Sequence, residues 1–144
     1  MPEKETLKRA RKDKREGKAP STQAGEFVRE EIEHIREGKH GARSTKQAIA
    51  IGLSKARRAG VELPPSEGSS QETKEQAKRD LRKAKSGKKP SAKRSRATRK
   101  ALKKEGRSAA SKEALSTQAR KAAKKRSAAS RSRSAKKAAK TRKK

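Results

Sequence analysis

The sequence predicts a mostly α-helical but largely disordered chain, in which a short helical hairpin precedes a polycationic, helix-prone tail. Val, Ile, Leu and Phe together make up only 13 of the 144 residues, or about 9%. Highly charged chains below roughly 20% are usually disordered. Lys and Arg outnumber Asp and Glu by 46 to 16, which gives a formal net charge of +30. This composition excludes a large packed enzyme core.

Net charge is distributed unevenly along the chain. It is +4 for residues 1–20, +1 for 21–68, +3 for 69–85 and +22 for 86–144. Only two large aliphatic residues, Leu102 and Leu115, lie in the last segment. We therefore expect a basic N-terminal helix at 1–20, a small helical hairpin at 21–65, a charged helix and linker at 66–90, and a disordered or transiently helical basic tail at 91–144.

The nearly neutral middle of the chain contains the predicted hairpin. Phe27, Val28, Ile32 and Ile35 share one helical face, which predicts an amphipathic helix from about residue 25 to residue 37. Gly38 is a suitable C-terminal stop for that helix.

A second helix is predicted to begin after Ser44. Ser44 and Gln47 have the spacing of a capping box, and Ile49, Leu53 and Ala56 repeat at helical intervals up to Gly60. Leu63, Pro64 and Pro65 then close the unit, because proline cannot continue a hydrogen-bonded helix. So few apolar side chains favour marginal stability and association with a second copy or a protein partner. The side chains expected in that association are Phe27, Val28, Ile32, Ile35, Ile49 and Leu53.

Four more segments have helical signals but little apolar surface. They cover residues 3–16, 71–85 after Ser69, 92–104 after Ser91, and about 109–126. Like charges at i, i+4 spacing repel, and isolated helices of this length are marginal in water. We expect these segments to fluctuate when free and to fold on a polyanion.

The basic tail predicts binding to the phosphates of a nucleic acid, most simply duplex DNA. The tail has no Phe, Tyr or Trp on which single-stranded bases could stack, and sequence readout would need a rigid element. Phosphate contacts without sequence preference remain. The residues expected to make them are Lys93, Arg94, Arg96, Arg99, Lys100, Lys103, Lys104, Arg107, Arg120, Lys121, Lys124, Lys125, Arg126, Arg131, Arg133, Lys136, Lys137, Lys140 and Arg142.

Other function classes stay open or fit less well. The same phosphate chemistry would serve an RNA-binding or ribosome-associated protein. An adaptor that uses its hairpin to bind a protein is a further alternative. A membrane surface fits less well, because interfacial helices need several large apolar residues on one face. We expect a cytoplasmic, nucleoid-associated protein, since no stretch approaches 18 apolar residues.

No catalytic, metal or cofactor site is expected. Glu30 and His34 share a helix face and His40 follows six residues later, but zinc sites need three or four converging ligands and the chain has no Cys. No glycine-rich phosphate-binding motif occurs either. A nuclease is a further hypothesis, but the sequence has no set of acid–base or metal-binding residues that would support it.

Two stretches resemble a known family. Residues 39–61, KHGARSTKQAIAIGLSKARRAGV, are similar to the signature of a small basic bacterial family of unknown function. Some of its members are labelled plasmid stabilisation or DNA-binding proteins. Residues 97–107, ATRKALKKEGR, resemble that family's C-terminal part and, more loosely, linker-histone-like tails rich in Lys, Ala and Ser. The resemblance implies a bacterial, DNA-associated role and assigns no catalytic residue.

Overall fold

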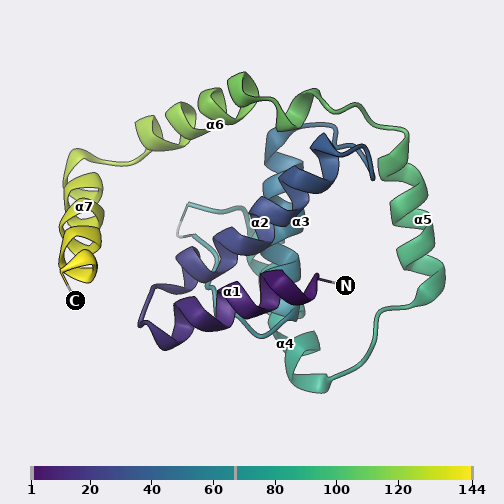
Figure 1. Cartoon of the computed structure of the whole chain (residues 1–144), viewed down its shortest axis with the longest axis horizontal. Helices are drawn as coiled ribbons and strands as arrows, with labels where there is room; N and C mark the ends of the chain where they lie inside the picture. Colours follow the sequence, from purple (N-terminus) through teal and green to yellow (C-terminus); the bar gives the residue numbers. More distant parts are fainter. Residues whose placement is uncertain (1, 67, 144) are drawn as a thin grey trace.

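The computed structural model describes residues 2–66 and 68–143, and within these residues it contains helices and no strand (Figure 1). The elements in chain order are α1 (Lys4–Arg15), α2 (Pro20–Arg36), α3 (Thr45–Arg58), α4 (Gln71–Ser86), α5 (Ala92–Lys103), the short 3₁₀ helix η1 (Ser108–Ala110), α6 (Lys112–Lys125) and α7 (Ala128–Arg142). Successive contacts of α1 with α2, α2 with α3 and α3 with α4 make a central bundle, and α5, α6 and α7 extend around it (Figure 1). None of the helices described is long and apolar enough to span a bilayer.

The prediction of a largely disordered chain is wrong, because helices continue through the basic tail to Arg142. Order in the tail is local. Ser91, Ser111 and Ser127 each accept a hydrogen bond from the backbone N–H three residues later and so cap α5, α6 and α7. Ala, Lys and Arg are strong helix formers. Apolar content reflects only the surface available for burial, whereas caps and helix propensity stabilise helices without a core.

Helix boundaries follow the predicted caps with four exceptions. Helix α6 begins at Lys112 rather than near residue 109, because residues 108–110 form the 3₁₀ helix η1 and Ser111 caps α6. Helix α2 begins at Pro20 rather than near residue 25, because proline fits the first helical turn. Ser70 rather than Ser69 caps α4. Helix α7 was not predicted, since residues 128–142 have no apolar periodicity. The predicted stops at Gly38 and Gly60 are confirmed, with φ of 78° and 99°.

Helices α1, α2, α3 and α4 form the bundle. One of its two apolar clusters joins Ala10 of α1, Ala24 and Phe27 of α2, Ala56 of α3, and Val61, with Leu7, Leu53 and Leu63 packed at its edge. The α3–α4 contact is more polar. The fully buried Asp80 of α4 accepts hydrogen bonds from Ser54 Oγ at 2.6 Å and from Arg58 Nε at 2.9 Å. The buried ionic group is therefore paired, as burial requires.

Small residues make the contact face of α3. The fully buried positions are Ala48 and Ala56, with Gly52 buried between them, whereas Ile49 and Leu53 are only half-buried. The predicted apolar stripe is thus displaced by one residue at Ile49 and Leu53, whereas Ala56 is in the core as predicted. A Cβ at Gly52 would lie 2.6 Å from Val28 Cα, so the two backbones are closer than any larger residue permits.

Replacing Gly52 by Ala is expected to lower the free energy of unfolding by about 1–3 kcal/mol, because α2 and α3 must move apart. Gly25→Ala on α2 is the matched control, since a Cβ there meets nothing within 4 Å. Alanine in an unobstructed helix should raise stability by about 0.5–1 kcal/mol. Urea denaturation followed by circular dichroism would measure both changes. Equal effects of the two substitutions would contradict the close approach.

A segment from the tail half of the chain completes the core. Ala109 and Ala110 of η1 are buried with Ile32, Ile35, Ala42 and Ala48, and Leu115 of α6 packs beside them. Five hydrogen bonds join this segment to residues 36–45, and residues 36–45 donate four of them. Gly41 N donates to Leu102 O at 2.9 Å, Ala42 N to Gly106 O at 3.1 Å, Thr45 Oγ1 to Ala109 O at 2.7 Å, and Arg36 Nε to Ala110 O at 2.9 Å. The tail is therefore anchored to the bundle partway along its length.

Candidate nucleic-acid interface

The cations that the sequence assigns to nucleic-acid binding lie on three helices and their flanks, and all of them are exposed. Those of α5 and its C-cap are Lys93, Arg94, Arg96, Arg99, Lys100, Lys103 and Lys104. Arg107 lies in the loop before η1. Those of α6 and its C-cap are Arg120, Lys121, Lys124, Lys125 and Arg126, and those of α7 are Arg131, Arg133, Lys136, Lys137, Lys140 and Arg142. None of the residues in α5, α6 or α7, all of which the structure describes, is buried.

Five of these cations form a single stripe along α5. Arg96, Arg99, Lys100, Lys103 and Lys104 follow one another at i, i+3, i+4, i+7 and i+8, and they line one shallow, open depression. Residues at this spacing face the same side of a helix. We call these five residues the α5 stripe. Anions placed against these side chains would relieve their mutual repulsion.

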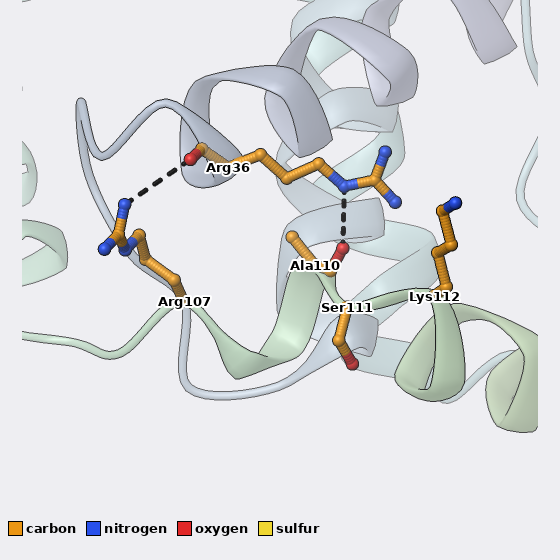
Figure 2. Close-up of a pocket in the computed structure, with 5 residues that line it drawn as sticks. All are labelled: Arg36, Arg107, Ala110, Ser111 and Lys112. Atoms are coloured by element: carbon orange, nitrogen blue, oxygen red, sulfur yellow. Dashed lines mark hydrogen bonds between the residues drawn. The ribbon is translucent and has the colours of Figure 1, made fainter.

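A second cationic site forms where the tail docks on the bundle. Figure 2 shows the residues that line it: Arg36 from α2, Arg107, Ala110, Ser111 and Lys112. These five residues, which we call the junction pocket, surround an open depression of about 390 Å³. Arg107 Nη1 donates to Arg36 O at 3.5 Å, and Arg36 Nε donates to Ala110 O at 2.9 Å. Each arginine side chain therefore contacts the backbone of another residue that lines the pocket (Figure 2).

The junction pocket lies at the N-terminal end of α6. Ser111 Oγ accepts from Ala114 N at 3.1 Å and caps the helix, whose dipole places partial positive charge at this end. Arg36 and Lys112 were not among the predicted binding residues. Lys112 has no other Lys or Arg within four residues, and Arg36 lies in the nearly neutral middle of the chain. Only the docking of η1 brings them together.

The bundle and the tail differ in how their basic side chains are paired with acidic ones. In the bundle, Arg9 Nε lies 2.6 Å from Glu26 Oε2, Arg58 Nε lies 2.9 Å from Asp80 Oδ1, and Lys18 Nζ lies 2.8 Å from Asp13 Oδ1. Hydrogen bonds to Asp13 and Glu16 raise the pKa of Lys18 above its ordinary value. Within residues 68–143, by contrast, no Lys or Arg forms a salt bridge with a described acidic group. The tail cations are therefore free to pair with an external anion.

The side chains predicted to associate with a partner are mostly used inside the chain. Phe27 and Ile35 are 1% and 0% exposed, and Ile32 is buried as well. Val28, Ile49 and Leu53 are half-buried at the edges of the clusters. The apolar surplus that suggested an association surface is thus largely covered by α1, α3 and η1.

The match to a known family covers only the first part of the chain. Residues 4–67 match the model of a family of unknown function, DUF6496. The matched part holds α1, α2 and α3 and includes the stretch 39–61 whose resemblance to such a family was noted above. The α5 stripe and α7 lie beyond the DUF6496 match. No curated protein and no solved structure matches the chain.

Proposed function

We propose that this chain is a non-enzymatic protein that binds duplex DNA through phosphate contacts and without sequence preference, in nucleoid organisation or plasmid maintenance. The observation that carries the proposal is the state of the tail cations: they are exposed on ordered helices, and no described acidic group neutralises them. A surface of this kind releases condensed counterions when it meets a nucleic-acid backbone. Net charge of +30 adds long-range attraction.

Duplex is favoured over single-stranded nucleic acid by the absence of stacking groups. The only aromatic side chain of the Phe, Tyr and Trp type is Phe27, which is 1% exposed in the bundle core. Binders of single strands commonly stack bases on exposed aromatics. A single α-helix, by contrast, fits the major groove of B-form DNA, and the α5 stripe would then lie against phosphates.

Sequence tolerance follows from how α5 is held. Base readout needs a recognition element whose position is set by packing against the rest of the protein. Helix α5, described in full, has no buried residue, so packing does not hold it in one orientation. Its Lys and Arg side chains suit phosphate contact, which positions a protein on DNA but carries no sequence information.

The bundle would serve as the anchor of the binding helices. The hydrogen bonds from residues 36–45 to residues 102–110 attach the tail between α5 and α6. As a result α5 and α6 leave the bundle from one fixed point, and the junction pocket adds Arg36 to the cations of the tail. We propose that a backbone phosphate occupies this pocket in the complex.

A salt titration of binding to a random-sequence duplex tests the proposal. Fluorescence anisotropy would follow the full chain between about 50 and 200 mM salt, with a second duplex of unrelated sequence and a structured RNA as competitors. If about ten cations contact phosphates, the log–log slope should be near −9. The two duplexes should bind equally and the RNA should compete poorly. A shallow slope, or displacement by RNA at lower concentration than by DNA, would contradict duplex binding.

A further inference from the structure

Two histidines and a glutamate converge where α2 meets the loop that follows it, and a second glutamate lies beside one of the histidines. The sequence alone predicted no metal site, because Glu30 and His34 lacked a converging third ligand. The fold supplies one. The chain reverses after Gly38, whose φ is 78°, and returns His40 to the side of α2. Potential ligand atoms of Glu31, His34 and His40 then all lie within 4.8 Å of one another. The His34 and His40 rings meet edge to face, with centroids 6.1 Å apart.

In a neutral His40 ring, the lone pair of Nε2 faces a carboxylate. His40 Nδ1 lies 2.9 Å from Gly41 O, and because a carbonyl oxygen only accepts, Nδ1 carries the proton. In a neutral imidazole Nε2 is then an acceptor. It lies 3.1 Å from Glu31 Oε2, which is an acceptor too. A cation between these two atoms satisfies both, and an Nδ1–H bonded to a backbone carbonyl is the usual support of a metal-binding histidine.

Glu30 provides a second, independent observation. Its side chain is 2% exposed, and its Oε2 accepts from Glu3 N at 3.2 Å. Its Oε1 is buried and has no hydrogen-bond partner in the part of the chain that the structure describes. This oxygen lies 4.0 Å from His34 Nε2 and so is beside one member of the cluster. A buried carboxylate oxygen without a partner is costly unless a cation or donor reaches it.

The charges around the cluster do not fully neutralise its carboxylates. Glu31 is 1% exposed, and its Oε1 is held by Lys55 of α3, which leaves Oε2 for a further partner. His34 Nε2 donates to Glu3 Oε1 at 2.8 Å, so a metal bound at this nitrogen would replace that hydrogen bond. Glu3 Oε1 also lies 3.5 Å from Lys39 Nζ, and these contacts lower the pKa of Glu3. Glu30 has no Lys or Arg within ion-pair distance among the described residues. The site therefore retains an unbalanced negative charge.

We propose that Glu31, His34 and His40 bind a divalent transition-metal ion such as Zn²⁺, with Glu30 as the fourth ligand. Imidazole nitrogens and carboxylate oxygens suit Zn²⁺ at about 2.0–2.2 Å, and four protein ligands make a closed structural site. Tetrahedral geometry at these bond lengths places ligand atoms about 3.4 Å apart. The ligand atoms of Glu31, His34 and His40 lie within 4.8 Å of one another, so metal binding would close them by side-chain rotation.

The ion would strengthen the anchor of the tail. His40 directly precedes Gly41 and Ala42, whose N–H groups donate to Leu102 and Gly106. A metal that joins His40 to α2 would therefore fix the part of the loop against which residues 102–110 pack. This role is structural and does not depend on the proposed DNA binding.

Titration of the full-length chain, freed of metal and nucleic acid, with Zn²⁺ tests the site. Calorimetry should show one ion per chain, and thermal unfolding followed by circular dichroism should shift upward with Zn²⁺. His34→Gln and His40→Gln should each weaken binding at least tenfold and abolish the thermal shift. Glu33→Gln, on the same helix but 46% exposed and outside the cluster, should bind as the unmodified chain does.

Histidine ring resonances give a measurement that needs no variant. His34 and His40 are the only histidines, so both ring signals should move on addition of one equivalent of Zn²⁺. Absence of one-site binding, unchanged ring signals, or equal affinity in the His34→Gln, His40→Gln double variant would overturn the proposal. The last result would assign the metal to other carboxylates.

Discussion

Replacing all five residues of the α5 stripe by Gln should make duplex binding less dependent on salt by about 4.5 in log–log slope. Each phosphate contact contributes about 0.9 to that slope through counterion release. The substituted residues are Arg96, Arg99, Lys100, Lys103 and Lys104, which share one face of α5. Affinity at about 50 mM salt should fall by several orders of magnitude. Gln is a good helix former, so α5 should persist.

The matched control removes the same charge from the bundle. Lys78, Arg79, Arg82, Lys83 and Lys85 are five exposed cations of α4, and their replacement by Gln lowers the net charge equally. Anisotropy titrations of both variants and the unmodified chain would compare slope and affinity. If net charge alone governs binding, the two variants will lose affinity equally, and the α5 stripe will have no particular role.

Gly41→Ala is expected to displace the tail from the bundle. A Cβ on Gly41 would lie 2.0 Å from Glu105 O, and backbone on both sides prevents relief by a side-chain rotation. Overpacking costs about 1–3 kcal/mol and the two backbone hydrogen bonds lost about 1 kcal/mol each, so the free energy of unfolding should fall by about 3–5 kcal/mol. That is a large share of the stability of an ordinary domain, which is roughly 5–15 kcal/mol.

Gly106→Ala is the control for this displacement, because a Cβ there meets nothing within 4 Å. It should change stability by about 0.5 kcal/mol or less, as surface substitutions usually do. Amide exchange separates docking from general destabilisation: the Ala42 amide, bonded to Gly106 O, should lose protection in Gly41→Ala before the α2–α3 core does. Equal stability of the two variants would show that residues 102–110 are not held against the loop.

The local structure of the bundle could be predicted from the sequence. Ser44 caps α3 as expected, with Gln47 N donating to Ser44 Oγ at 3.1 Å. The reciprocal bond of the capping box is shifted by one residue, since Gln47 Oε1 accepts from Arg43 N at 2.7 Å rather than from Ser44 N. Such signals act within one helical turn, so they can be recognised without knowledge of the fold.

Long-range packing could not be predicted in the same way. Counting large apolar residues assigned the core to residues 21–65, but Ala109 and Ala110 belong to it as well. The packing of α2 on α3 depends on Gly52, and small residues carry no hydrophobic signal in a sequence. The error over disorder has the same origin, because apolar counting ignores small-residue packing and capped polar helices.

The sequence by itself determined the helical content, the positions of most helix ends, and the concentration of positive charge in the second half of the chain. These properties depend on residue propensities, caps and composition, all of which act locally or simply add. The tertiary structure alone decided that η1 docks on the loop after α2, that Arg36 joins Arg107 and Lys112, and that His40 faces Glu31. Each of these contacts joins groups whose proximity depends on how the helices pack, which no local pattern encodes.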